Sequence, residues 1–207
     1  MIVLNDLLHL PVPLVLASQS PRRQSLMRHV GFVFTSVVPS IDEDAVDTAM
    51  PPADYVQELA WRKAQRGAEM ASGEAIVIGS DTTVVLDGAV LNKPTDADDA
   101  VAMLRRLSGR THTVHTGLAL VGKGMGLTSR RASRATNVTF RELSDEEIQA
   151  YVATGSPLDK AGAYGIQDDF GAVFVSRVEG CYYTIVGLPL ELLYTELREL
   201  VAESRHA

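Results

Sequence analysis

The chain has 207 residues, 46% of them hydrophobic and 22% charged, so it can bury an ordinary core and is neither disordered nor fibrous. Its net charge of −7 argues against broad binding to nucleic acid, which needs a basic surface. A single cysteine, Cys181, excludes an internal disulfide framework, and no apolar run approaches the length of a membrane span. The N-terminus resembles no signal peptide, so we expect a cytoplasmic protein without nucleic-acid or membrane partners.

The first part of the chain predicts a strand, a tight turn and a helix. Leu14 to Ala17 is a short apolar run, typical of a buried strand. A helix is expected from Pro21 to about Val30, because Ser20 is a favourable N-cap and proline is favoured at the first helical position. A second strand is expected at Val33–Val38. Apolar residues at helical spacing predict a long helix at Pro52–Ala71.

The rest of the chain alternates strands with helices. The run Ala75–Leu86, rich in Val and Ile, predicts a strand, and the pair Asp87-Gly88 after it is typical of a hairpin turn. The further predicted elements are a strand at Ala89–Leu91, a helix at Asp96–Leu107, β structure over Thr111–Phe140 broken around Gly122–Gly126, a capped helix from Ser144 to about Thr154, and a closing helix at Pro189–Val201. No repeat or flexible linker interrupts this order. We expect one domain over residues 1–207, of the α/β class, with a largely antiparallel or mixed sheet.

The segment from Ser18 to Arg23 has the features of a phosphate-binding turn. The chain leaves a buried strand there and enters a helix, so unpaired N–H groups and the positive end of the helix dipole face one point. Arg22 and Arg23 add donors in the first helical turn, where positive charge opposes the dipole and needs a compensating anion. The alternative is an N-capped helix with two exposed arginines. The residues of this segment alone give the two interpretations about equal weight.

Asp81 interrupts the apolar strand predicted at Ala75–Leu86. A buried carboxylate is costly unless it binds a metal, pairs with a cation or takes part in chemistry. Function is therefore favoured over a role in capping a turn. Lys63 lies on or beside the inward face of the helix predicted at Pro52–Ala71, so its charge is also placed near the core.

Other candidate residues give weaker signals when each is taken alone. Lys93 follows the hairpin, and Lys160 and Gln167 belong to a glycine-containing loop that permits close approach of the backbone to a ligand. Isolated lysines are usually solvated surface groups. Glu43 lies in an acidic loop that is either a solvated turn or a source of carboxylates for Mg²⁺.

Two histidines, His112 and His115, lie three residues apart on the predicted β structure. They should point to opposite faces of a strand and cannot ligate one metal together. We expect both at the surface or partly buried.

Five segments together resemble the Maf family of nucleoside triphosphate pyrophosphatases, over nearly the whole chain from Leu14 to about Leu200. The segments are Leu16–Arg23, Ser80–Thr82 with Asn92–Pro94, Leu107–His112, Asp159–Gln167 and Val186–Leu190. The resemblance implies a fold like that of Maf and inosine triphosphatase proteins: an elongated mixed β-sheet flanked by helices, with the active-site cleft between two lobes. It also implies a homodimer.

The resemblance further implies hydrolysis of a nucleoside triphosphate between its α and β phosphates, with a divalent cation, Mg²⁺ or Mn²⁺, as cofactor. Asp81 would then accept a proton from the attacking water, and Glu43 and Asp81 would associate with the metal. The residues that would bind the substrate are Ser18, Ser20, Arg22, Arg23, Lys63, Thr82, Lys93, Lys160 and Gln167. Among them, the lysines and arginines would offset the charge of the triphosphate.

Three of these residues, Arg23, Thr82 and Gln167, resemble the branch of the family that acts on dTTP and UTP. The amide of Gln167 presents both a donor and an acceptor to a thymine or uracil ring. This chain departs from the family pattern at Ser80, where alanine is usual, and at Asp168-Asp169-Phe170. The alternatives are a pyrophosphatase that removes methylated or other non-canonical nucleotides, and a non-catalytic nucleotide-binding regulator of septum formation. A pure binder has no need of Asp81 beside a polyanion, which disfavours the regulator.

Overall fold

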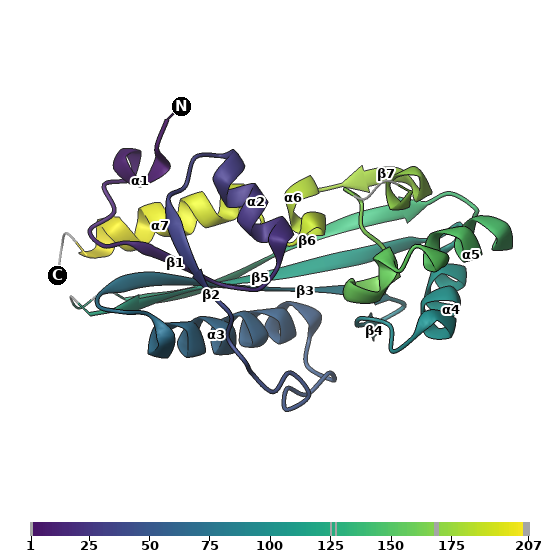
Figure 1. Cartoon of the computed structure of the whole chain (residues 1–207), viewed down its shortest axis with the longest axis horizontal. Helices are drawn as coiled ribbons and strands as arrows, with labels where there is room; N and C mark the ends of the chain where they lie inside the picture. Colours follow the sequence, from purple (N-terminus) through teal and green to yellow (C-terminus); the bar gives the residue numbers. More distant parts are fainter. Residues whose placement is uncertain (1, 125, 127, 168–169, 205–207) are drawn as a thin grey trace. The chain divides into compact units, whose positions relative to one another are not determined.

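A computed structural model of the chain describes residues 2–124, 126, 128–167 and 170–204 (Figure 1). Its strands are β1 (Leu14–Ala17), β2 (Phe34–Val37), β3 (Ala75–Leu86), β4 (Ala89–Leu91), β5 (Thr111–Lys123), β6 (Ser129–Phe140) and β7 (Val175–Glu179). Its α-helices are α1 (Leu4–Leu7), α2 (Pro21–His29), α3 (Pro52–Met70), α4 (Ala97–Leu107), α5 (Asp145–Ala153), α6 (Tyr182–Val186) and α7 (Leu190–Ser204). Short 3-10 helices lie at Ser156–Asp159, Ala161–Ala163 and Gly171–Phe174.

The strands form one mixed sheet in the order β2-β1-β3-β5-β6-β7, and β4 pairs with β3. Strand β1 is parallel to both β2 and β3, whereas the β3–β4 and β6–β7 pairs are antiparallel. The predicted α/β class with a mixed sheet is confirmed, as is each strand and helix predicted from the sequence. The elements that the sequence did not predict are α1, β7, α6 and the 3-10 helices.

Contacts divide the chain into two compact units. The first unit is Met1–Asp81, Thr116–Arg134 and Gly187–Ala207, and the second is Thr82–His115 and Ala135–Val186. The chain passes from the first unit to the second within β3, between Asp81 and Thr82. That the chain is a single domain stays a prediction.

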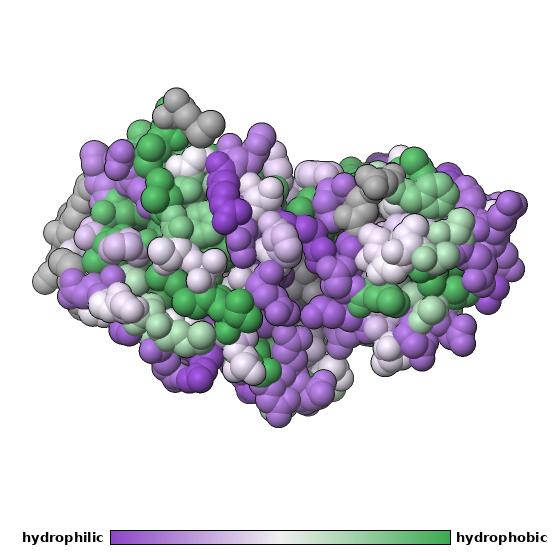
Figure 2. Space-filling view, in the orientation of Figure 1, coloured by the Kyte–Doolittle hydropathy of each residue, from purple (hydrophilic) through white to green (hydrophobic). Residues whose placement is uncertain are grey.

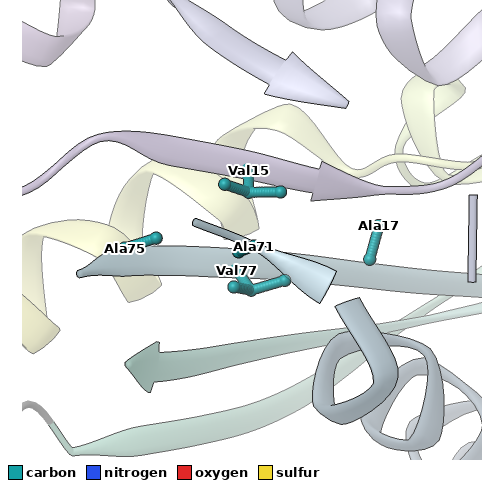
Figure 3. Packing of buried hydrophobic residues seen from close by; sticks show 5 residues of the cluster. All are labelled: Val15, Ala17, Ala71, Ala75 and Val77. Carbon is teal, nitrogen blue, oxygen red and sulfur yellow. The ribbon is translucent and has the colours of Figure 1, made fainter. Parts of the chain in front are cut away.

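In the first unit, α3 covers one face of the sheet, and α2 and α7 lie on the other (Figure 1). The face toward α3 is built from small side chains. Val15 and Ala17 of β1 pack with Ala75 and Val77 of β3 and with Ala71 at the end of α3 (Figure 3). Small residues on both surfaces allow the backbone of a helix to approach a sheet closely.

A close approach in this layer is at Gly79 of β3. A Cβ atom built there would lie 2.1 Å from the carbonyl oxygen of Ala60 and 2.8 Å from the backbone nitrogen of Ala64, both on α3. Real Cβ atoms do not approach backbone atoms so closely, so glycine is required. Since side chains alternate along a strand, Asp81 points to the same face as Gly79. The packing thus brings Asp81 beside Lys63, the residue that precedes Ala64 on α3.

In the second unit, aromatic rings surround His112 of β5. The ring of His112 makes T-shaped contacts with Phe140 and Tyr164, with centroids 5.0 and 5.3 Å away. Its Nε2 lies 2.8 Å from the hydroxyl of Tyr164, and its side chain is only 2% exposed. His115 is half-buried. The prediction that His112 lies at the surface or is partly buried was wrong, because strand periodicity gives the face of a residue but not its depth.

Burial gives His112 a measurable effect on stability. It lowers the pKa of His112 from 6.5 to about 4, because the charged imidazolium loses its hydration. Between these pH values the unfolded chain binds more protons than the folded chain, so stability falls as the pH decreases from 6.5 towards 4. As the pH falls from 7 to 5, we expect burial of His112 to lower the free energy of unfolding by about 2 kcal/mol.

Chemical denaturation at these two pH values measures the contribution of His112. In His112→Gln, the decrease in the free energy of unfolding between pH 7 and pH 5 should be smaller by this amount. In the control His29→Gln, which removes an exposed histidine of α2, the decrease should be the same as in the original chain. An unchanged pH dependence in His112→Gln would contradict the assignment.

The helices of the described residues can be compared with the length and hydropathy of a membrane span. None of the helices in this part of the chain is both long and apolar enough to cross a bilayer. On the face shown in Figure 2, hydrophobic residues lie in separate areas among hydrophilic ones, which is ordinary for a folded chain in water.

Candidate active site

The centre of the candidate site is a lysine held between two carboxylates. Lys63 of α3 donates a hydrogen bond from Nζ to Oδ1 of Asp81 over 2.6 Å, and the same Nζ lies 2.7 Å from Oε1 of Glu43. Asp81 lies inside β3 and is 8% exposed, whereas the side chain of Glu43 is 44% exposed. The cost of burying the Asp81 carboxylate is offset by the cation beside it. One lysine thus faces two acidic groups, one buried and one open to solvent.

The turn between β1 and α2 is organised by two serine hydroxyls. Ser18 Oγ accepts hydrogen bonds from the backbone N–H of Ser20 (3.1 Å) and from Nη1 of Arg23 (3.4 Å). Ser20 caps α2, since its Oγ accepts from the backbone N–H of Arg23 over 3.5 Å. The predicted cap and the predicted strand-turn-helix order are both confirmed. The hydroxyls hold the first turn of α2 in place.

Arg23 is half-buried against the same group of charges. Burial lowers the pKa of its guanidinium from the ordinary value, the charge of Asp81 raises it, that of Arg22 lowers it and that of Glu43 raises it. The first turn of α2 contains no acidic residue, so the negative charges near its arginines come from β3 and from the acidic loop. The alternative of an N-capped helix with two exposed arginines is right about the cap but wrong about the arginines, because Arg22 and Arg23 are both half-buried.

The first unit therefore gathers the predicted residues Ser18, Ser20, Arg22, Arg23, Glu43, Lys63 and Asp81. Three cationic and two acidic side chains leave this group with an excess of positive charge. With two hydroxyls and the N-terminus of α2, it offers favourable interactions to a polyanionic ligand.

The other predicted residues belong to the second unit. Thr82 follows Asp81 and is half-buried, while Lys93 and Gln167 are exposed. Lys160 is 8% exposed and so differs from an ordinary solvated lysine: its Nζ lies 2.6 Å from Oδ1 of Asp159 and also contacts Ser156. Their roles in binding a ligand stay predictions. Asp168 and Asp169 lie outside the described residues.

Hydrogen bonds that the sequence did not predict support the loops of the second unit. Thr83 is completely buried, and its Oγ1 lies 3.4 Å from Oδ1 of Asn92. The carbonyl of Asn92 accepts from the N–H of Gly162 over 3.2 Å. These contacts connect the segments that carry Lys93 and Lys160. The contact of Asn92 with Gly162 joins residues far apart in sequence, whereas Thr83 and Asn92 lie on either side of the β3–β4 hairpin.

The acidic residues suit a hard divalent cation. Glu43 and Asp81 approach the same Lys63 nitrogen, so their carboxylate oxygens converge on one small region. Mg²⁺ is typically bound by one or two carboxylates and completes its shell with water and substrate phosphates. No group of three or more His, Cys, Asp or Glu side chains with the arrangement of a metal site occurs in the described part of the chain. Two carboxylates therefore fit an ion that shares its ligands with a phosphorylated substrate.

The fold and this group of residues define an α/β protein with arginines, serine hydroxyls and a helix N-terminus close to a lysine-paired aspartate. The chain belongs to the Maf family, since the family model described as Maf-like protein matches residues 13–200. The resemblance stated from the five sequence segments is thereby confirmed.

Three relatives match most of the chain and are named dTTP/UTP pyrophosphatase. The protein of Salinibacter ruber is 48% identical over 97% of both chains. That of Symbiobacterium thermophilum is 53% identical over 86% of this chain and 88% of its own, and that of Vibrio cholerae is 48% identical over 86% and 92%. Among solved structures, a HAM1 protein from Coxiella burnetii is 17% identical with a TM-score of 0.45, and covers 91% of this chain and 99% of its own.

Proposed function

We propose that this chain is a nucleoside triphosphate pyrophosphatase that hydrolyses dTTP and UTP to the monophosphate and pyrophosphate. The observation that supports this most directly is the contact of Lys63 with Asp81 and Glu43, near the arginines of α2. Relatives that match 86–97% of the chain carry the name of this activity. A triphosphate brings several negative charges, which matches the excess of positive charge in the group of Arg22, Arg23 and Lys63 with Glu43 and Asp81.

In the proposed reaction, water attacks a phosphorus atom and the bond to the pyrophosphate leaving group breaks. Asp81 accepts the proton that the water releases, and its Oδ1 is held in place by the hydrogen bond from Lys63. Lys63, Arg22 and Arg23 offset the charge that develops on the phosphoryl oxygens. General-base assistance of this kind contributes about 10²- to 10⁴-fold to a rate.

Glu43 and Asp81 would hold the divalent cation, Mg²⁺ or Mn²⁺. When bound, such an ion polarises phosphoryl oxygens and stabilises their charge. Glu43 is the more exposed of the two carboxylates and so remains accessible to an ion that enters with the substrate. Asp81 would supply the second carboxylate, with its Oδ1 hydrogen-bonded to Lys63.

Four residues of the second unit are also proposed to take part in substrate binding. Lys93 and Lys160 supply further positive charge, and Thr82 and Gln167 are proposed to contribute to the choice of base. The amide of Gln167 offers a donor and an acceptor to a pyrimidine ring. We further propose that residues 1–207 form one domain and that the protein is a cytoplasmic homodimer. Sedimentation of the purified chain tests the dimer.

A panel of nucleotides tests the proposed substrate. Pyrophosphate release from dTTP, UTP, CTP, ATP, GTP and methylated pyrimidine triphosphates should be measured with Mg²⁺ and with Mn²⁺. We expect the highest kcat/KM for dTTP and UTP. Higher values for methylated or other non-canonical nucleotides would favour the alternative of a pyrophosphatase for such substrates. Nucleotide binding without any turnover would favour the non-catalytic regulator.

A further inference from the structure

We propose that Ser80 is a positioning residue for Arg23 and acts through the backbone carbonyl of Gly187. The proposal rests on the proposed function, in which Arg23 binds the triphosphate. Ser80 directly precedes Asp81 in β3, and its side chain points to the opposite face of the strand. That face is the one on which α2 lies (Figure 1).

The contacts of the Gly187 carbonyl carry the proposal. Its oxygen accepts a hydrogen bond from Nε of Arg23 over 2.7 Å. The same oxygen lies 3.0 Å from Oγ of Ser80, whose single O–H is shared between this carbonyl and that of Gly117 in β5, 2.9 Å away. One carbonyl therefore joins the guanidinium of α2 to the strand that bears Asp81.

The backbone at Gly187 favours this arrangement. Its φ is 111°, a conformation that L side chains rarely adopt, so glycine lets the chain turn there without strain. Ser80 is completely buried, and its hydroxyl has no access to water as an alternative partner. A buried hydroxyl that loses its acceptors is costly, so the contact restrains both the serine and the carbonyl.

The orientation of Arg23 follows from these restraints. Nε donates to Gly187 and Nη1 to Ser18, which fixes the plane of the guanidinium at two points. An arginine oriented in advance loses less entropy when it binds a phosphate. Without the hydroxyl of Ser80, the carbonyl keeps Arg23 as its partner but loses its link to β3. Substrate binding should weaken, whereas the proton transfer to Asp81 should not change.

A double-mutant cycle tests the coupling. In Ser80→Ala we expect KM for dTTP to rise roughly threefold to tenfold, the range of a lost hydrogen bond, with kcat within about twofold of the original chain. In the Arg23→Ala background, Ser80→Ala should raise KM no further. Ser80→Cys, which keeps the volume and a weak donor, should lie between serine and alanine. A normal KM in folded Ser80→Ala, or fully additive effects of the two substitutions, would overturn the proposal.

A matched control separates positioning from general stability. Thr136 is also a buried hydroxyl that donates to a carbonyl, that of Cys181 over 3.1 Å, but it is not among the residues described above that contact Arg23 or Gly187. Thr136→Val should lower the unfolding temperature and leave KM unchanged. If Thr136→Val raised KM as much as Ser80→Ala does, the effect of Ser80 would be general destabilisation.

The affinity for inorganic triphosphate tests the role of Ser80 without relying on catalytic turnover. Calorimetry should show weaker binding of this probe in Ser80→Ala and in Arg23→Ala, again without additivity. If the original chain releases no pyrophosphate but the coupling in triphosphate affinity is present, the proposed function fails and the role of Ser80 stands. If pyrophosphate is released but the coupling is absent, the role of Ser80 fails alone.

Discussion

Replacing Asp81 with asparagine is expected to slow pyrophosphate release from dTTP by about 10²- to 10⁴-fold, the usual contribution of a general base. Asparagine has nearly the same shape and keeps an oxygen that accepts the hydrogen bond from Lys63, but it does not accept a proton from water. The fold should therefore be retained, whereas metal-dependent binding of the triphosphate should weaken because the proposed cation site loses one of its two carboxylates. Steady-state rates and thermal unfolding of the variant check both parts of this expectation.

Asp87→Asn is the matched control for this substitution. Asp87 is an exposed carboxylate in the β3–β4 turn and pairs with Arg110 over 2.6 Å. Its replacement removes the same charge without touching Lys63, so the rate should stay close to that of the original chain. Full activity in Asp81→Asn would show that another group accepts the proton.

The second large effect is expected from Gly79→Ala. The added Cβ would lie 2.1 Å from the carbonyl oxygen of Ala60, so α3 must move away from β3. We expect a loss of about 3 kcal/mol or more in the free energy of unfolding, at or above the upper end for an overpacked core. For a chain of this length that corresponds to a fall of about 10 °C in Tm. Because Lys63 moves with α3, the hydrogen bond to Asp81 should lengthen and activity should fall as well.

Gly73→Ala separates crowding from backbone strain. Gly73 has a φ of 73°, and a Cβ there meets no atom within 4 Å. Its replacement should cost only about 1 kcal/mol, the penalty for a left-handed conformation. Calorimetric unfolding of the two variants compares these costs. Equal losses would contradict the close packing of α3 on β3.

The sequence predicted those parts of the fold that depend on local patterns. Ser20 and Pro21 mark the start of α2, and the pair Asp87-Gly88 marks the hairpin, because caps and turns are decided by neighbouring residues. Strand β7 was missed because its residues Val175–Glu179 are all partly or fully exposed and show no continuous apolar run. Helix α6 has only five residues, too few to show a helical period.

The candidate site was predictable only in part. Asp81 was conspicuous because a charge interrupted an apolar strand, and the paired serines and arginines were conspicuous because they lie together in sequence. The contact of Lys63 with Asp81 depends on how closely α3 approaches β3, which the pattern of either element alone does not give. The contact of Ser80 with Gly187 spans 107 residues, and neither residue has a local signal of that pairing.

The most direct test of the central claim is the identity of the products that the purified chain forms from dTTP with Mg²⁺ or Mn²⁺. Separation of the nucleotides, with a parallel assay for pyrophosphate and orthophosphate, shows which products form and therefore which phosphate bond is cleaved. We predict dTMP and pyrophosphate in equal amounts, without dTDP. Formation of dTDP and orthophosphate would contradict cleavage between the α and β phosphates, and with it the proposed activity.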